Sequence, residues 1–112
     1  MSRNLVTSLI ETANSMAAQG RAELALRLYT NVLLEPTDPQ NRLRALRGYA
    51  RSLWLGLPRR DRGPEGIENA CLELSKQLIA AGRIKPGEID YLIGLALSFN
   101  SGDRQNGLQA LH

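Results

Sequence analysis

The sequence predicts an all-α fold built as a stack of antiparallel helix pairs. Apolar residues recur at steps of three and four residues almost throughout the 112-residue chain, and no stretch alternates with the period of a β-strand. Glycine and proline divide this pattern into segments of helical length. Similar segments then recur along the chain, which is typical of a helical repeat. A chain of this length is expected to form one domain with a single modest core.

The first two helices are expected over residues Asn4–Ala18 and Ala22–Leu34. Gly20 separates them, because glycine tolerates the left-handed conformation that often follows a helix C-terminus. The expected buried face of the first helix is Leu5, Leu9, Ala13 and Met16. That of the second is Ala22, Ala25, Leu26, Tyr29, Val32 and Leu33. Pro36 and Pro39 then end the pattern, because proline lacks the N–H donor that a continuing helix needs.

The third helix is expected to start at Pro39 or Gln40, with Asp38 as its N-cap. Its apolar residues follow a period of 3.6 and predict a buried face of Leu43, Leu46, Ala50, Leu53, Trp54 and Leu57. The segment LPRRDRGPEG that follows is expected to be a loop because it is rich in proline, glycine and charge.

The fourth helix is expected from about Glu65 to Ala81, and it buries Ile67, Ala70, Cys71, Leu74 and Leu78. After the break at GRIKPGE, the segment EIDYLIGLALSFNSG predicts a fifth helix that is apolar nearly all round. The final DRQNGLQALH predicts a short sixth helix that starts after Gly102.

An internal repeat groups these helices into pairs. RGYARSLWLG at 47–56 aligns with IGLALSFNSG at 93–102, so that Gly48 matches Gly94 and Gly56 matches Gly102. The repeat predicts three units, at about 4–38, 39–82 with an inserted loop at 57–65, and an incomplete 86–112.

The first unit resembles the tetratricopeptide repeat, a family of paired antiparallel helices. The resemblance rests on Leu9, Ala13, Met16, Gly20, Ala25, Tyr29 and Pro36. It implies a right-handed superhelical stack of about three units and five to six helices. It also implies that the first helix of each unit lines a concave groove in which another polypeptide binds.

Composition and motifs argue against several other classes of protein. No apolar run approaches the roughly 20 residues of a membrane-spanning helix, and the N-terminal stretch lacks the features of a secretory signal. Cys71 is the only cysteine, so we expect a reduced thiol, no metal site and a cytoplasmic location. His112 is the only histidine, and paired carboxylates and phosphate-binding glycine loops are missing, so the sequence predicts no enzyme and no cofactor.

The candidate binding residues come from a short stretch rich in arginine. Arg44, Arg47 and Arg51 are spaced to share one face of the third helix. They are expected to line a basic groove together with Ile10 and Asn14 of the first helix and Tyr91 of the fifth. The alternative is an ordinary solvated helix face. Arg59, Arg60 and Arg62, in the inserted loop, are expected either to be solvated or to make a second contact with an acidic partner or a phosphate.

These features favour a protein-interaction scaffold or adaptor that holds an extended or helical segment of a partner, an acidic segment being one option. The first alternative is binding of RNA or another nucleic acid through the patch from Arg42 to Arg62, although aromatic residues for base stacking are few. The second alternative is self-assembly. The apolar C-terminal helices lack a polar cap, which suggests either a piece of a longer repeat protein or pairing with a second copy.

Overall fold

A computed structural model describes residues 3–110, with the backbone alone at Arg3, Arg59 and residues 100–110. It confirms the all-α prediction: the described residues form five α-helices and one short 3₁₀ helix, with no strand among them. The elements are α1 (Arg3–Ala18), α2 (Ala22–Leu34), α3 (Pro39–Gly56), η1 (Arg59–Asp61), α4 (Pro64–Ala80) and α5 (Glu88–Ala110). The bounds expected for the first four helices are correct to within about one residue.

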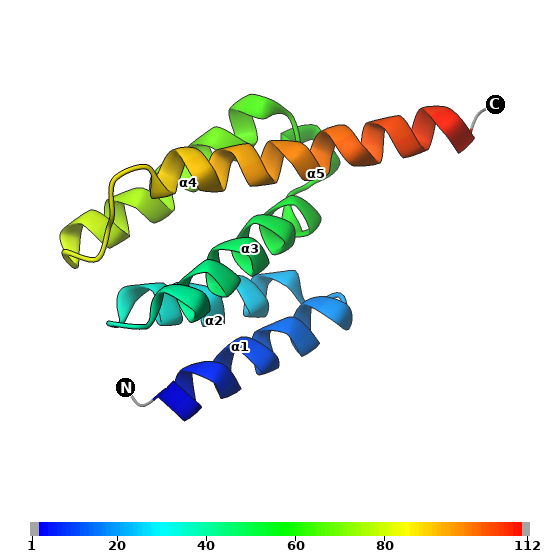
Figure 1. The fold of residues 1–112 in the computed structure, drawn as a ribbon. Coiled ribbons are helices and arrows are strands. Elements are labelled where there is room, and N and C mark those ends of the chain that lie inside the picture. The colour runs from blue at the N-terminus through cyan, green and yellow to red at the C-terminus, as the bar shows by residue number, and fades with distance from the viewer. Residues whose placement is uncertain (1–2, 111–112) are drawn as a thin grey trace.

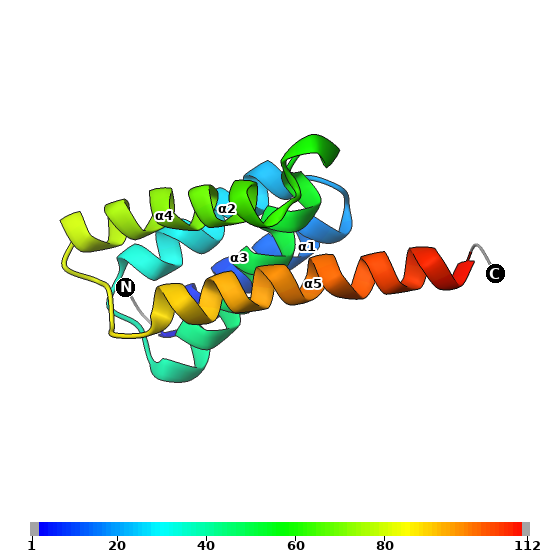
Figure 2. The ribbon, with the colours of Figure 1, turned by 90° about the horizontal axis from the view of Figure 1, so that it is seen from above.

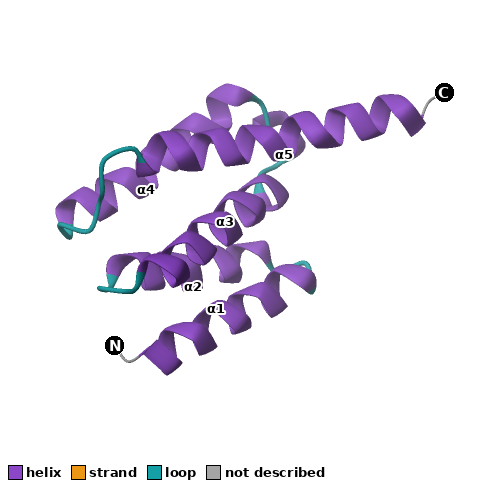
Figure 3. Ribbon diagram, in the orientation of Figure 1, coloured by secondary structure: helices purple, strands orange, loops and turns teal. Residues whose placement is uncertain are grey.

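The helices form two layers (Figures 1 and 2). Helices α1, α3 and α5 lie side by side in one layer, and α2 and α4 form the other. Consecutive helices run in opposite directions, and short loops connect them (Figure 3). The most extensive contacts join α2 to α3 and α1 to α2, whereas α3 and α4 barely touch. The inserted segment that contains η1 separates α3 from α4, so this second pair of helices is more open than the pair of α1 and α2.

Two of the chain reversals use glycine in the same way. Gly20 and Gly82 have φ values of +81° and +67°, which side-chain-bearing residues rarely adopt. At the first turn, Gly20 N–H donates to Ala17 O and Arg21 N–H donates to Met16 O, at 3.1 and 2.8 Å. Gly82 and Arg83 repeat this Schellman pattern at the end of α4. The expected helix end at Gly20 is therefore confirmed.

The predicted start of α3 is confirmed as well. The Asp38 side chain accepts a hydrogen bond from the backbone N–H of Asn41 at 3.2 Å, and Pro39 occupies the first turn. An aspartate at this position satisfies a donor that the helix itself cannot pair. The cap fixes where α3 begins and thereby sets which of its residues face α1, α2 and α5.

The buried face of α1 differs from the predicted one. Val6, Ile10 and Ala13 are buried, whereas Leu5 is 50% exposed and Leu9 and Met16 are only partly buried. The face is turned by about one residue, or roughly 100° around the helix. The reason is that α1 packs against both α2 and α3, and the face between Leu5 and Leu9 points away from that junction.

Helix α3 also buries a different set of residues than expected. Leu46, Ala50 and Leu53 are buried as predicted, but Leu43 is 37% exposed, and Trp54 and Leu57 are partly buried. The additional buried residues are Asn41, Arg42, Ala45, Tyr49 and Ser52. Because α3 contacts all four other helices, it is buried over a wide arc, and a single apolar stripe does not describe it.

The predicted end of the fifth helix and the short sixth helix are wrong. Helix α5 runs without interruption from Glu88 through Gly102 to Ala110, and its C-terminal part extends beyond the other helices (Figures 1 and 2). A glycine inside a helix costs only about 1 kcal/mol relative to alanine, so it does not by itself end the helix. No helix in the part of the chain that the structure describes is long and apolar enough to cross a membrane.

Candidate functional site

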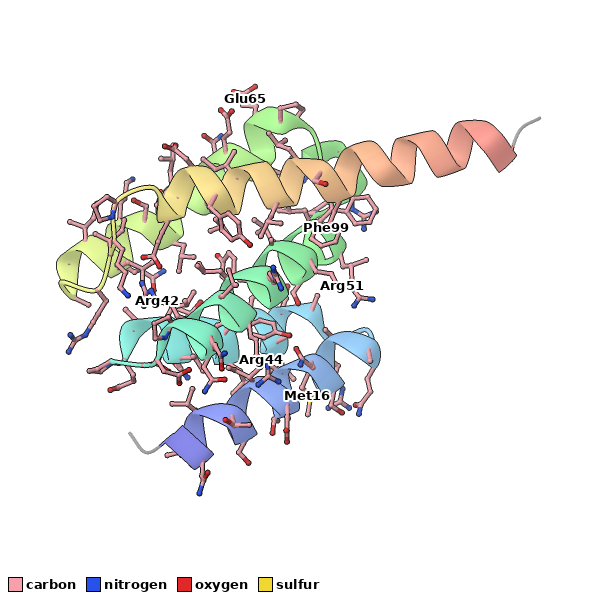
Figure 4. All side chains as sticks on the ribbon, in the orientation of Figure 1. Met16, Arg42, Arg44, Arg51, Glu65 and Phe99 are labelled. Atoms are coloured by element: carbon pink, nitrogen blue, oxygen red, sulfur yellow. The ribbon has the colours of Figure 1, made fainter. Side chains whose placement is uncertain are left out.

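A cavity with a volume of about 530 Å³, the main cavity, lies on the α1, α3 and α5 side of the molecule. It is lined by Asn14, Ala17 and Ala18 of α1, Tyr29 of α2, Arg44, Arg47, Gly48, Arg51 and Ser52 of α3, and Phe99 of α5. Figure 4 shows Arg44 and Arg51 on α3, with Phe99 next to Arg51 on the α5 side. Three helices of one layer therefore contribute to the wall, and α2 of the second layer contributes to the floor.

Three arginines give the cavity its charge. Arg44, Arg47 and Arg51 are all exposed, and no aspartate or glutamate is among the described residues that line the cavity. Arg44 Nη1 donates to Asn41 Oδ1 at 3.2 Å, and Arg47 Nε donates to the Tyr91 hydroxyl at 3.4 Å. Arg51 makes no hydrogen bond or ion pair to a described residue. Most of the guanidinium donors of this cluster therefore remain open to a ligand.

The polar floor of the cavity is held by Tyr29. Its hydroxyl donates a hydrogen bond to Asn14 Oδ1, which links α2 to α1. The ring fits against Gly48, where an added Cβ would overlap the ring atoms. Burial raises the pKa of Tyr29 above 10.0, because it outweighs the opposing influence of the neighbouring Ser52 hydroxyl and of the Arg51 and Arg44 charges. Tyr29 is therefore a neutral hydrogen-bond donor at ordinary pH.

Ser52 adds a buried hydroxyl beside this tyrosine. The residue is 1% exposed, and its Oγ makes no hydrogen bond within the described part of the chain although it neighbours Tyr29. Buried hydroxyl groups nearly always have a partner, since leaving one without a partner costs about 1–3 kcal/mol. Ser52 thus places a buried hydroxyl, close to the Tyr29 hydroxyl, at the floor of the cavity.

Several of the predicted binding residues lie together. Asn14, Arg44, Arg47 and Arg51 line one cavity, and Tyr91 adjoins it through its contact with Arg47. Ile10 does not take part: it is 0% exposed within the core, so the expectation that it lines the groove is wrong. The one-residue rotation of the α1 face is the reason, because it turns Ile10 inward and leaves Asn14 at the surface.

A second, smaller hollow adjoins Tyr91. It has a volume of about 340 Å³ and is mainly apolar, lined by Pro39, Arg42, Leu43, Leu46, Lys85, Pro86, Gly87, Glu88 and Tyr91. Leu43 and Tyr91 are among the exposed large apolar residues of the protein. Since Arg47 lines the main cavity and contacts Tyr91, the two hollows are neighbours on the same face.

Arg42 is not part of the surface patch, contrary to the sequence-based grouping of Arg42 to Arg62. It is buried, and its guanidinium binds the Glu88 carboxylate at 2.5 and 2.8 Å, as well as Leu33 O and Arg83 O. Its charge is neutralised inside the protein. The basic surface therefore begins at Arg44.

The arginines of the inserted segment differ from one another. Arg62 donates hydrogen bonds to Leu57 O and Leu55 O, at 2.9 and 3.2 Å, and lies over the Trp54 ring at 4.7 Å. It thus satisfies carbonyls at the C-terminal end of α3, a role that the sequence did not indicate. Arg60 is exposed and lies 3.7 Å from Asp61, whereas the Arg59 side chain is outside the described part of the structure. Neither Arg60 nor Arg62 lines the main cavity.

Sequence reasoning missed Tyr29, Gly48, Ser52 and Phe99 as parts of the site. Tyr29 was expected to be purely a core residue, and the recurrence of Gly48 and Ser52 at 94 and 98 indicated only helix packing. The available signal was the pairing of one large aromatic residue with a glycine on the next helix. Because the Tyr29 ring packs against Gly48, which has no side chain, the Tyr29 hydroxyl can reach the cavity on the other side of α3.

Groups with reactive chemistry are remote from this cavity. Cys71 is fully buried in the core, and burial, with a smaller effect of Glu68, raises its pKa to about 11, so its thiol stays protonated. The described residues contain no cluster of three or more histidine, cysteine or acidic side chains that could hold a metal ion.

Comparison with known proteins gives no further guidance. No protein-family model, curated protein or solved structure matches the chain. The resemblance to tetratricopeptide repeats therefore rests on the sequence alone.

Proposed function

We propose that the protein is a tetratricopeptide-like scaffold that binds an acidic segment of another protein on its α1, α3 and α5 face. The observation that carries this proposal is that Arg44, Arg47 and Arg51 line one cavity whose other described lining residues include no carboxylate. Clustered like charges repel one another, and an anionic partner removes that repulsion. The order of the helices supports the proposal, because the first helix of each predicted pair contributes to this face.

The chemistry of arginine suits this role. A guanidinium group offers five donors in a planar fork and pairs with a carboxylate through two parallel hydrogen bonds. Arg51 has its fork free of described partners, and Arg44 and Arg47 each use one nitrogen within the protein. Their internal bonds orient the two side chains, which reduces the entropy lost when a partner binds.

Nucleic-acid binding and self-assembly remain the alternatives. The internal roles of Arg42 and Arg62 count against the first, because they shorten the basic patch on which it depends. Among the cavity-lining side chains only Tyr29 and Phe99 are aromatic, which is few for base stacking. We place the protein in the cytoplasm, where its single buried thiol would remain reduced.

The proposal is tested with a fluorescein-labelled decaglutamate peptide at low salt. We expect the double variant Arg44→Glu/Arg51→Glu to lose at least about tenfold in affinity, since charge reversal replaces attraction by repulsion. The matched control is Arg21→Glu/Arg27→Glu, which changes the net charge equally at exposed positions outside the cavity. Circular dichroism checks that all variants keep their helices.

Two results would count against the proposal. Equal affinity of the two double variants would show that net charge alone attracts the peptide. Tighter binding of an oligouridine, with the steep salt dependence that phosphate contacts produce, would favour the nucleic-acid alternative.

A further inference from the structure

We infer that the segment bound in this cavity carries a phosphorylated residue, and that an apolar side chain two or three residues away occupies the adjoining hollow. The inference rests on the proposed function and makes the partner more specific. It joins two features of one face: the cationic cavity around Arg44, Arg47 and Arg51, and the apolar hollow around Leu43, Leu46 and Tyr91.

The first step concerns charge. Three arginines of α3 line the cavity, and no carboxylate among the described lining residues opposes them. One carboxylate on a partner would neutralise a single positive charge, whereas a phosphomonoester carries about −1.5 to −2 at neutral pH. It also presents three acceptor oxygens, so that more than one guanidinium group can donate to it. The charge of the site is therefore better balanced by a phosphomonoester than by a glutamate or aspartate.

The second step concerns the buried hydroxyl at the floor. Ser52 Oγ is shielded from solvent and makes no hydrogen bond to a described residue. The Tyr29 hydroxyl already donates its hydrogen bond to Asn14 Oδ1, so Tyr29 is not available as a donor to a ligand. A phosphate oxygen that reaches the floor would accept a hydrogen bond from the Ser52 hydroxyl, which pairs a buried polar group. A ligand confined to the rim of the cavity leaves that group unpaired.

The third step concerns the neighbouring hollow. Arg47 lines the cavity and donates to the Tyr91 hydroxyl, and Tyr91 lines the hollow, so this pair stands between the two sites. The α3 residues that line the cavity are centred near Gly48, and those that line the hollow are centred near Leu43. Five residues of helix correspond to about 8 Å. An extended peptide covers that distance in two or three residues, at about 3.3 Å each.

The experiment uses labelled peptides that have phosphoserine at the centre of a glycine- and serine-rich sequence. A leucine is placed three residues before or three residues after the phosphoserine, because the structure does not set the direction of the bound chain. Matched peptides replace phosphoserine by glutamate or serine, or leucine by serine. Binding is measured at pH 7.5 and pH 5, on either side of the second phosphate pKa of about 6.

We expect one phosphoserine–leucine peptide to bind at least about tenfold more tightly than its glutamate counterpart, a difference of about 1.4 kcal/mol. That advantage should shrink at pH 5, where the phosphate takes up a proton. Ser52→Ala should weaken binding of the phosphopeptide and leave the affinity for the glutamate peptide unchanged. Leu43→Ser should remove only the advantage of the leucine, and Leu72→Ser, at an exposed residue of α4 outside both hollows, is its matched control.

The other outcomes distinguish failure of the phosphate inference from failure of the proposed function. If the glutamate peptide binds as tightly as the phosphopeptide and both depend on Arg44 and Arg51, the phosphate inference is wrong and the proposed function stands. If neither peptide binds, both fail. If a 5′-phosphorylated oligouridine binds more tightly than every peptide, the site recognises nucleic acid and the inference is overturned.

Discussion

The Arg42 guanidinium and the Glu88 carboxylate form a buried ion pair that joins α3 to the start of α5. Nε lies 2.5 Å from Oε2 and Nη2 lies 2.8 Å from Oε1, and the two side chains are only 6% and 12% exposed. Arg42 also donates to Leu33 O at the end of α2 and to Arg83 O before α5, and Glu88 accepts from the Lys85 N–H (Figure 4 shows Arg42). One side chain thus ties together four segments of the chain.

Replacing Arg42 by methionine should destabilise the protein strongly. The substitution leaves the Glu88 charge half-buried without its partner and removes the donors to two carbonyl groups. Breaking a buried pair in this way typically costs about 3–5 kcal/mol. Urea denaturation followed by circular dichroism measures the loss. Lys76→Met is the matched control, because Lys76 forms an exposed pair with Glu73 and should change stability by less than about 1 kcal/mol.

The double variant Arg42→Met/Glu88→Met provides the stricter test. Removing both charges leaves no unpaired ion, so this variant should be more stable than Arg42→Met alone. A double variant that is less stable by the sum of the two single losses would show that the pair itself contributes little.

Glu88 should also make the stability depend on pH in the acid range. Burial raises the pKa of Glu88, but hydrogen bonds from Arg42 and the Lys85 N–H and the nearby positive charges outweigh it, so the pKa lies below 4.5. The unfolded state therefore takes up this proton first as the pH falls. The stabilisation is fully present above pH 4.5 and is lost as the pH falls through the pKa of the folded state.

The measurement compares wild type with Glu88→Gln between pH 7 and pH 3. We expect the difference in unfolding free energy to be largest at neutral pH and to shrink below pH 4.5. A difference that stays constant across this range would mean that ionisation of Glu88 does not contribute.

Gly48 and Gly94 occupy matching places in the repeat, yet alanine should have opposite effects at the two positions. A Cβ at Gly48 would overlap the buried Tyr29 ring, whereas a Cβ at Gly94 meets nothing within 4 Å. Gly48→Ala should cost about 1–3 kcal/mol through overpacking. Gly94→Ala should stabilise by about 0.5–1 kcal/mol, because alanine is the better helix former. Thermal unfolding of the two variants checks this prediction, and a stabilised Gly48→Ala would contradict it.

Arg62→Ala should lower stability without weakening peptide binding. It removes two hydrogen bonds to the end of α3 and the contact with Trp54, together worth about 1 kcal/mol for a half-exposed group. Trp54 is the only tryptophan, so its fluorescence reports the change directly. Arg60→Ala, at an exposed pair, should be neutral. Loss of peptide affinity in the Arg62 variant at unchanged stability would instead make the inserted loop a contact site.

Local signals in the sequence predicted helix boundaries well and helix faces less well. The N-cap at Asp38 and the turn glycine at Gly20 act on adjacent residues, so their effect is readable from a few positions. Gly102 gave the wrong boundary because a helix tolerates glycine unless the chain must turn there. Ile10 was misplaced because the direction of a helix face depends on which neighbours cover it.

At the candidate site, too, the sequence predicted the local features, and tertiary packing decided the rest. The spacing of Arg44, Arg47 and Arg51 placed them on one helix face, and the structure brings them to one cavity with Asn14. The sequence grouped Arg42 with the basic patch of the nucleic-acid alternative, although its guanidinium is inside the protein. Its partner Glu88 lies 46 residues away, and such a contact exists only after α5 has packed on α3.

By itself the sequence determined that this chain is helical, where most of its helices begin and end, and that its positive charge gathers on α3. These features follow from interactions between residues within a turn or two of one another. The tertiary structure alone decided which arginine is buried and which are exposed, and that Tyr29 and Ser52 form the floor of the cavity. The physical reason is that burial and pairing depend on the relative placement of whole helices, which is set by packing across long separations in the chain.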